Sequence, residues 1–324
     1  MWLNHHRFQL AVKELENQLT PFTSQTTMNS ARQQVFRREP LPKIIFICGG
    51  DPKHHPNRAV MEQYLKKHSK NILTFRAEFA WETIISSHET VNALELEEWL
   101  ADFSDVVVIL VESFGTVAEL GAFSMGTNLR KKLLPILDKK YKSDPSFINT
   151  GPVRWIDHDS RYGPSIYADF DCLLTSMPTV LERIDVKRSK VYASRKNNDK
   201  TYGELKFSRK EILFLVVLVV ISIGPVEQQT VIDICKKSFN IKGASDIGDL
   251  RFILSLTVAL GLVSIVNYSD KHFFYCKSYE NLKTSDSMGT LLKISQPIRS
   301  RCLSHLVYIP EYVDLIKRIS DDSL

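Results

Sequence analysis

The chain has 324 residues, of which 44% are hydrophobic and 24% are charged, and its net charge is +5 at pH 7. This composition is ordinary for a globular protein of about two domains and argues against a disordered or fibrous chain. Five scattered cysteines without a C-x-x-C pair argue against a disulfide framework and a zinc site, so we expect a reducing, cytoplasmic setting.

The first part of the chain predicts a helical extension followed by a parallel α/β domain. Apolar residues recur at helical spacing over 8–19, so residues 1–40 are predicted to form the extension. Between 41 and 180, β-branched runs alternate with amphipathic stretches, which is typical of a parallel sheet in a three-layer domain. Strands are expected at 44–48, 72–75, 106–111 and 133–137, helices at 57–68, at 96–103 and from Thr116, and a loop over 143–167.

The carboxyl ends of parallel strands meet at one edge of the sheet, where open α/β domains bind their ligands. Small residues and carboxylates follow the predicted strands and are our candidates for substrate binding: Gly49, Gly50, Asp51, Glu78, Ser113, Gly115 and Thr116. Carboxylates accept hydrogen bonds from ribose hydroxyls, and a helix that starts at Thr116 can hold an anion. Asp51 as a turn residue and Glu78 as a solvated strand end are equally open interpretations.

Glu119 lies just inside the helix that follows the 106–111 strand. The spacing Thr116-x-x-Glu119 fits a capping box, in which the glutamate reaches back to the first free amide of the helix. The same position, at the carboxyl end of a central strand, also suits a catalytic carboxylate. The spacing alone leaves both interpretations open.

A basic stretch separates the two predicted domains. Residues 183–210 hold ten Lys or Arg against three acidic residues, an excess of seven that exceeds the net charge of the whole chain. Interleaved aromatic residues suit phosphate binding with base stacking, whereas a solvated linker over 181–206 is the alternative interpretation. The candidates for nucleic-acid contact here are Lys187, Arg188, Lys190, Arg195 and Lys196.

Residues 207–285 are predicted to form a mostly helical winged helix-turn-helix domain, and 286–324 a C-terminal tail. Helices are expected over 209–223, from Pro225 to about 239 and over 246–260, followed by a hairpin of strands 262–267 and 272–277. The apolar run 212–223 is too short to span a bilayer, which takes roughly 20 residues, so we expect a buried helix and no membrane contact.

The candidate recognition helix carries Asp246, Asp249 and only one basic residue, Arg251. A helix that reads base edges usually presents more Arg, Lys, Asn or Gln, so we expect no sequence-specific recognition of duplex DNA. Backbone contacts through Arg251 and through Lys271 on the wing, or docking on a protein, fit this composition better.

Three segments, 47–51, 108–124 and 146–153, resemble the effector proteins of a class of bacterial retrons. Those effectors join a nucleoside 2-deoxyribosyltransferase-like domain to a winged helix. The most specific part, Ser113-x-Gly-Thr-x-x-Glu119-Leu-Gly, is similar to the deoxyribosyltransferase nucleophile motif, and by this match Glu119 is the nucleophile. The resemblance covers the first domain well and the second mainly through the order of its elements.

The resemblance implies a toxic N-glycosidase of phage defence that acts on NAD or nucleotides. It implies that the enzyme is held by a reverse transcriptase and its branched RNA–DNA product (msDNA), and it leaves room for a homo-oligomer or filament. We expect no cofactor other than NAD as a substrate, and no metal.

One departure from the deoxyribosyltransferase pattern bears on the substrate. Typical transferases carry an aspartate six positions before the nucleophile, where this chain has Ser113. The cationic nicotinamide of NAD leaves as a neutral base and needs no acid, so the departure favours NAD. Two further interpretations stay open: a nucleic-acid-binding regulator with a catalytically dead nucleotide-sensing domain, and a true nucleoside deoxyribosyltransferase.

Overall fold

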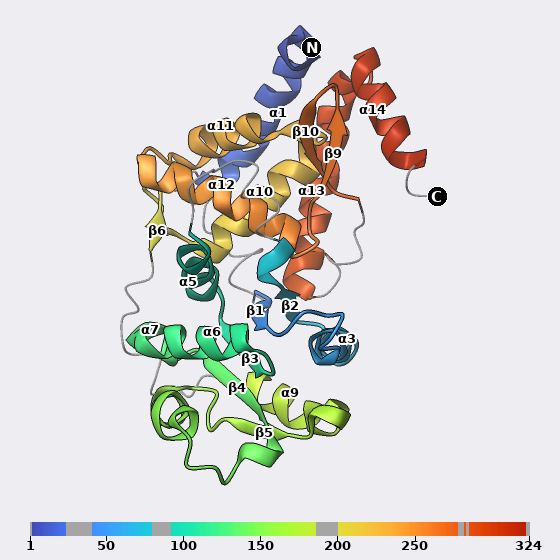
Figure 1. The fold of residues 1–324 in the computed structure, drawn as a ribbon. Coiled ribbons are helices and arrows are strands. Elements are labelled where there is room, and N and C mark those ends of the chain that lie inside the picture. The colour runs from blue at the N-terminus through green and yellow to red at the C-terminus, as the bar shows by residue number, and fades with distance from the viewer. Residues whose placement is uncertain are drawn as a thin grey trace. The chain divides into compact units, whose positions relative to one another are not determined.

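The computed structural model describes residues 2–23, 41–79, 92–185, 200–277, 282 and 285–321. The chain forms two compact units: a sheet unit over Lys43–Asn197, and a helical unit made of Met1–Pro42 together with Asn198–Leu324. The fold is thus an α/β unit with a parallel sheet plus a mostly helical unit, as the sequence predicted (Figure 1). No helix within the described ranges is long and apolar enough to cross a membrane.

The sheet unit is organised around five parallel strands in the order β2-β1-β3-β4-β5. Their bounds are β1 (Lys43–Cys48), β2 (Ile72–Phe75), β3 (Val106–Val111), β4 (Leu133–Asp138) and β5 (Ile166–Ala168). The first four match the predicted strands to within one residue, because each is an aliphatic run that can be buried on both faces. The predicted loop over 143–167 is wrong in part, since it contains α8 (Arg154–Asp159) and the start of β5.

Helices cover both faces of this sheet, which gives the expected three layers. Alternate strand residues such as Ile45 and Val106 form a core with α3 (Asn57–His68) and α9 (Met177–Asp185). On the other face, α5 (Ala93–Phe103) packs against β1, and α6 (Phe114–Met125) packs against β3. Short α7 (Thr127–Arg130) then leads into β4.

The strand order contains a switch in direction between β1 and β3. The chain leaves β1 through α3 to reach β2 on one side, and then crosses to β3 on the other side of β1. Because the connections diverge there, the carboxyl ends of β1 and β3 border the crevice in which doubly wound α/β proteins bind ligands. Cys48 ends β1 at this crevice, and Glu112 directly follows β3.

The helical unit is built around α10 (Arg209–Ile223), which is buried from Glu211 to Ile223. A helix that is hydrophobic all round must be covered on every side. It contacts α1 (His6–Thr23), α11 (Gln228–Phe239), α12 (Ala244–Ala259) and α13 (Asp286–Leu306). Three helices, α10 to α12, therefore precede a hairpin, in the order predicted for a winged helix.

The hairpin consists of β9 (Ser264–Tyr268) and β10 (Lys271–Tyr275), and β10 also pairs with β8 (Val226–Glu227). Its two turn residues, Ser269 and Asp270, both have positive φ, which is the conformation of a primed two-residue turn. A second small ribbon, β6 (Thr201–Tyr202) with β7 (Phe207–Ser208), precedes α10.

Both ends of the helical unit are packed helices, and the C-terminal one differs from the predicted tail. The extension predicted over 1–40 includes α1, which packs against α13 and α11 and buries Phe8, Leu15 and Leu19. The tail predicted over 286–324 is α13 followed by α14 (Pro310–Asp321), and α14 buries Tyr312 and Leu315. Charged residues dilute the apolar stripes of α13 and α14, so the sequence analysis did not predict these two helices. Of the predicted linker 181–206, residues 186–199 lie outside the described residues.

Candidate active site

Glu112, which follows β3, forms hydrogen bonds with residues that follow β1 on the other side of the switch point. Its side chain is only 3% exposed, and its two oxygens accept hydrogen bonds from the Gly50 amide at 3.0 Å and from Asn57 Nδ2 at 3.1 Å. The carboxylate that follows β3 therefore holds the turn that follows β1. Sequence reasoning did not single out Glu112.

The glycines of that turn face the protein's own side chains. A Cβ added at Gly50 would lie 2.3 Å from the His55 ring, and one added at Gly49 would lie 3.0 Å from Cδ of Arg58. Larger residues would thus displace the start of α3. The predicted need for small residues here has its reason in the packing of His55 and Arg58.

The start of α6 tests the capping interpretation of Glu119. Ser113 is the N-cap and forms a capping box with Thr116, whose hydroxyl also accepts from the amides of Glu112 and Ser113 at 3.1 and 3.0 Å. The helix begins at Phe114, so Glu119 lies in its second turn. The predicted Thr116–Glu119 capping box is therefore wrong, because the helix starts before Thr116.

Glu119 is instead a largely buried carboxyl group at the switch point. Its Oε2 atom is buried, and no described residue forms a hydrogen bond with it. Burial raises the pKa of Glu119 above its usual value; a hydrogen bond from Cys48 lowers it, the charge of Glu78 raises it, and that of Arg58 lowers it. Burial, followed by the charge of Glu119, raises the pKa of the Cys48 thiol, so this thiol stays protonated as the donor.

Two further carboxylates face Glu119. Glu97 of α5 has its pKa raised to about 7, first by burial and then by the charges of Glu119 and Glu78. Glu78 follows β2 and accepts a hydrogen bond of 2.6 Å from Nη2 of Arg58. A carboxyl group that titrates near neutral pH can take up or give a proton in a reaction. Nowhere in the described ranges are His, Cys, Asp or Glu side chains arranged to hold a metal ion.

The structure brings together only some of the predicted substrate-binding residues. Gly49, Gly50 and Glu78 contact Glu112 or Arg58, whereas Ser113 and Thr116 form the cap of α6. Gly115 is exposed, and so is Asp51, whose side chain accepts from the Lys53 amide as a turn residue does. The residues that sequence reasoning missed are Cys48, Arg58, Glu97 and Glu112. The only feature of the sequence that could have indicated these residues is a polar side chain at a position that the periodic pattern predicts to be buried.

Replacement of Glu97 by glutamine should stabilise the protein at alkaline pH. The folded state raises the pKa of Glu97 from 4.5 to about 7, so its stabilising contribution is complete below pH 4.5 and is lost as the pH rises through 7. We expect Glu97→Gln to be more stable than wild type by about 1–2 kcal/mol at pH 8, after allowance for solvent screening, and equal to it near pH 4.

Urea unfolding at the two pH values measures this difference. Glu98→Gln is the matched control, because Glu98 is exposed on the same helix. An equal effect of Glu97→Gln at both pH values would contradict the assignment.

The candidates for nucleic-acid contact are divided between residues outside the described ranges and residues of the helical unit. Lys187, Arg188, Lys190, Arg195 and Lys196 lie outside the described residues. Arg251 is half-buried on α12, and Lys271 on the hairpin forms an ion pair of 2.7 Å with Glu227.

The acidic start of α12 is partly neutralised from within the helical unit. Lys200 Nζ lies 3.1 Å from Asp246 Oδ1 and 2.8 Å from Asp249 Oδ2, and the Tyr202 hydroxyl donates to Asp249 at 2.6 Å. The two aspartates that argued against sequence-specific recognition of duplex DNA thus already have cationic or hydrogen-bond partners.

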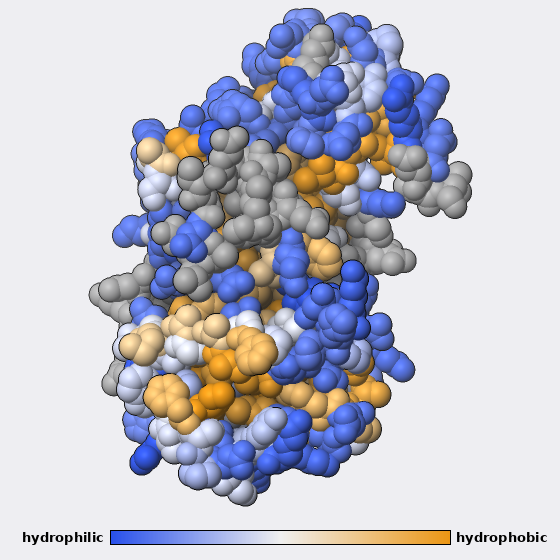
Figure 2. Space-filling view, viewed as in Figure 1, coloured by the Kyte–Doolittle hydropathy of each residue, from blue (hydrophilic) through white to orange (hydrophobic). Residues whose placement is uncertain are grey.

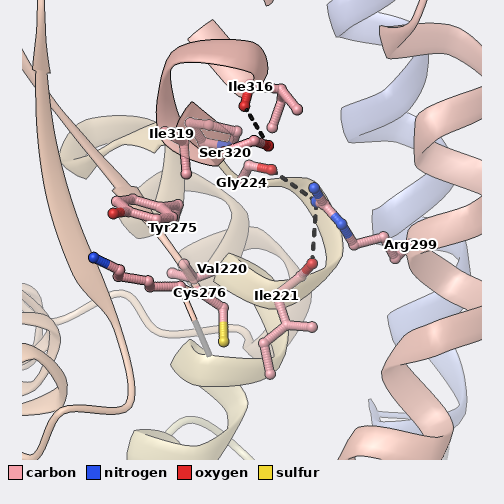
Figure 3. Close-up of a pocket in the computed structure, with 11 residues that line it drawn as sticks. Val220, Ile221, Gly224, Tyr275, Cys276, Arg299, Ile316, Ile319 and Ser320 are labelled. Atoms are coloured by element: carbon pink, nitrogen blue, oxygen red, sulfur yellow. Dashed lines mark hydrogen bonds between the residues drawn. The ribbon is translucent and has the colours of Figure 1, made fainter. Parts of the chain in front are cut away.

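A cavity of about 370 Å³ also lies in the helical unit, between the end of α10, the end of β10, α13 and α14 (Figure 3). Arg299 of α13 points to its upper edge and donates to the carbonyl oxygens of Gly224 at 2.7 Å and Ile221 at 3.2 Å. The guanidinium therefore satisfies carbonyls at the end of α10. Both aliphatic and polar residues line the rest, among them Ile316, Ile319 and Lys277. No carboxylate of the Glu119 cluster lines this cavity.

Comparison with known proteins assigns the chain to a family. A protein of Escherichia coli retron Ec86, which carries the name of a ribosyltransferase/DNA-binding protein, is 43% identical over 111 residues, or 34% of this chain and 36% of the relative. The corresponding protein of E. coli retron Ec73, with the same form of name, is 23% identical over 266 residues, or 75% of this chain and 83% of the relative. The chain thus spans only about a third of the first of these relatives.

The family described as STM3845 retron effector protein matches residues 54–265, which include α3, Glu78, Glu97 and Glu119 of the sheet unit and α10 to α12 of the helical unit. This range covers more than half of the sequence and both structural units. The chain therefore belongs to the STM3845 retron effector family.

Proposed function

We propose that this retron effector is an N-glycosidase that hydrolyses the N-glycosidic bond of NAD or a related nucleotide, with Glu119 as the nucleophile. The observation that carries the proposal is the buried Glu119 carboxylate at the switch point of the sheet, with one oxygen free of any hydrogen bond from a described residue. An oxygen without a hydrogen-bond partner keeps its lone pairs for a reacting carbon. The ribosyltransferase names of the two E. coli relatives support glycosyl-transfer chemistry.

In the first step, a Glu119 oxygen attacks C1′ of the ribose as the C1′–N bond breaks. The bonding electron pair moves to the ring nitrogen, so nicotinamide leaves as a neutral base, and the transition state resembles an oxocarbenium ion. Glu78, Glu97 and Glu119 outweigh the single positive charge of Arg58 in this cluster. An excess of negative charge favours a substrate whose leaving group is cationic.

In the second step, water attacks C1′ and the bond to Glu119 breaks, which returns the electron pair to the carboxylate. The water must lose a proton, and Glu97, with its pKa near 7, is the group we assign to accept it. A second base in place of water would give transfer between bases, which is the transferase alternative. The two outcomes differ only in what reaches C1′ first.

The experiment that tests the proposal is incubation of the purified full chain with NAD, nucleosides and nucleotides, followed by chromatography for free base. Release of nicotinamide from NAD supports the assignment, whereas base release that requires a second added base indicates a transferase. If no member of the panel loses its base, the chain is better described as a nucleotide-sensing regulator.

We also propose that the helical unit docks on the retron reverse transcriptase and its branched RNA–DNA, and that docking holds the enzyme in check. An enzyme that destroys NAD inside its own cell must be gated. The retron effector family and the DNA-binding names of the relatives support docking on a nucleic-acid complex. Failure of the chain to co-purify with that complex would contradict this proposal.

Binding to branched or single-stranded nucleic acid should weaken steeply with salt, because phosphate contacts release counterions. We expect simultaneous replacement of Lys187, Arg188, Lys190, Arg195 and Lys196 by glutamine to flatten that salt dependence. Fluorescence anisotropy at several salt concentrations measures the slope. Lys66→Gln combined with Lys67→Gln, two exposed cations on α3, is a control that should leave it unchanged.

A further inference from the structure

The cavity of the helical unit is large enough for a small organic molecule. Its volume of about 370 Å³ lies at the lower end of the range of roughly 300–1,000 Å³ that is typical of small-molecule sites. The end of α10, the end of β10, α13 and α14 all border it. A molecule bound here would therefore touch the hairpin and both C-terminal helices at once.

Part of the cavity wall is aliphatic. Ile221, near the end of α10, is only 3% exposed, whereas Ile316 and Ile319 of α14 are half-buried. The two isoleucines of α14 lie across the cavity from Ile221 (Figure 3), and Figure 2 shows that hydrophobic residues gather beside α14 on the viewed face of the helical unit. Covering such surface favours binding in proportion to the apolar area removed from water.

Two cations line the same cavity without a carboxylate partner among the described residues. Arg299 donates to the carbonyl oxygens of Ile221 and Gly224. Its Nη2 atom lies 3.4 Å from the Tyr312 hydroxyl, so all three acceptors are neutral. Lys277, which follows β10, is exposed and forms no ion pair with a described residue. Since no described Asp or Glu lines the cavity either, its charge is complementary to an anion.

The fold holds the guanidinium of Arg299 in place and keeps this corner of the cavity open. The carbonyl oxygen of Gly224 accepts at 2.7 Å from Arg299 and at 2.9 Å from the Tyr312 hydroxyl. Carbonyl groups at the end of a helix lack partners within the helix, and an aliphatic side chain packed into the corner would leave them and the guanidinium unsatisfied. A cation that is already fixed loses little side-chain freedom when it binds a ligand.

We propose that this cavity binds a small amphipathic organic anion. Its apolar body lies against the isoleucines of α10 and α14, and its acidic group is held by Lys277 and Arg299. All the lining residues belong to the helical unit, so the site is separate from the Glu119 cluster and does not depend on the proposed glycosidase activity. A ligand that binds only the folded state would stabilise the packing of the hairpin against α13 and α14.

Fluorescence titration of the full chain with anilinonaphthalene sulfonate tests the proposal. Uncharged phenylnaphthylamine, which has the same rings but no sulfonate, is the matched probe. We expect one saturable site for the sulfonate, with a Kd at least about tenfold below that of the uncharged probe, because the sulfonate gains charge-assisted hydrogen bonds. The Tm of the chain should rise with the sulfonate concentration.

Three variants locate the site. Lys277→Gln should weaken sulfonate binding about fivefold to tenfold and leave the uncharged probe unaffected, and it should fold because Lys277 is exposed. Ile319→Trp should fill the cavity and remove the binding of both probes. Lys317→Gln is the control, because Lys317 is an exposed cation of α14 that does not line the cavity.

Equal affinity for the two probes overturns the proposal, and so does unchanged sulfonate binding in Lys277→Gln. Unchanged binding in folded Ile319→Trp also overturns it, since the probe then binds elsewhere. If Ile319→Trp does not fold, the comparison of Lys277→Gln with Lys317→Gln decides. An equal loss in these two lysine variants would show a general attraction to the positive charge of α14 and its neighbours, which contradicts a site in the cavity.

Discussion

Glu119→Gln should lose base release by at least about a thousandfold in kcat/KM while the protein stays folded. Glutamine has nearly the same shape but cannot form the ester bond to C1′ or neutralise an oxocarbenium ion. The cap of α6 should survive, because Ser113 and Thr116 form it without Glu119. Removal of a buried carboxylate whose pKa is raised by burial should leave stability equal or slightly higher at pH 8.

Thr116→Val provides the structural contrast. It removes the hydroxyl that accepts from two backbone amides, so it should cost about 1–2 kcal/mol of stability. Base release measured by chromatography and urea unfolding of both variants separate the two roles. Near-normal turnover in folded Glu119→Gln would end the catalytic assignment, and a stability loss equal to that of Thr116→Val would show that Glu119 is structural after all.

The sequence predicted the strands well because their signal is local. A run such as 106–111 can only be buried, and four such runs separated by helical patterns leave few arrangements other than a parallel sheet. β5 was missed because it has only three residues and completes the sheet by pairing with β4. Its strand character comes from its partner, which a local pattern does not contain.

Residues of the candidate site were predicted only where they come soon after a strand in the sequence. Glu119 and the two glycines follow buried strands, so their place on the edge of the sheet could be inferred. Arg58 and Glu97 lie on helices and look like ordinary surface charges in the sequence. Only the tertiary packing, which covers Arg58 and places Glu97 beside Glu119, distinguishes them from solvated residues.

The cap of α6 shows that a local sequence pattern can also predict the wrong helix start. The spacing Thr116-x-x-Glu119 satisfies the capping-box rule, but Ser113-x-x-Thr116 lies three residues earlier and closes the helix first. Two overlapping sequence patterns each predict a start for the helix. The helix starts at the earlier one, directly after the turn in which Glu112 accepts a hydrogen bond from the Gly50 amide. This selection leaves Glu119 free of any structural duty at the helix terminus.

Trp2→Ala should destabilise the protein far more than Trp155→Ala does. Trp2 is 2% exposed, and its ring lies 5.0 Å from that of Phe8, 5.6 Å from that of Phe273 and 5.3 Å from that of Tyr312. It thus joins the start of the chain to the hairpin and to α14. Buried Trp-to-Ala replacements cost about 3–5 kcal/mol, and we expect the lower end because the buried Nε1 has no hydrogen-bond partner among the described residues.

Trp155→Ala is the matched control, because Trp155 is 50% exposed and contacts the guanidinium of Arg130 in a cation–π arrangement. It should cost less than about 1 kcal/mol. Urea unfolding followed by circular dichroism measures both. If Trp2→Ala costs no more than Trp155→Ala, the N-terminal segment is not part of the core; if the large loss is found, the segment belongs to the core that supports the hairpin, and partner binding must use other surfaces.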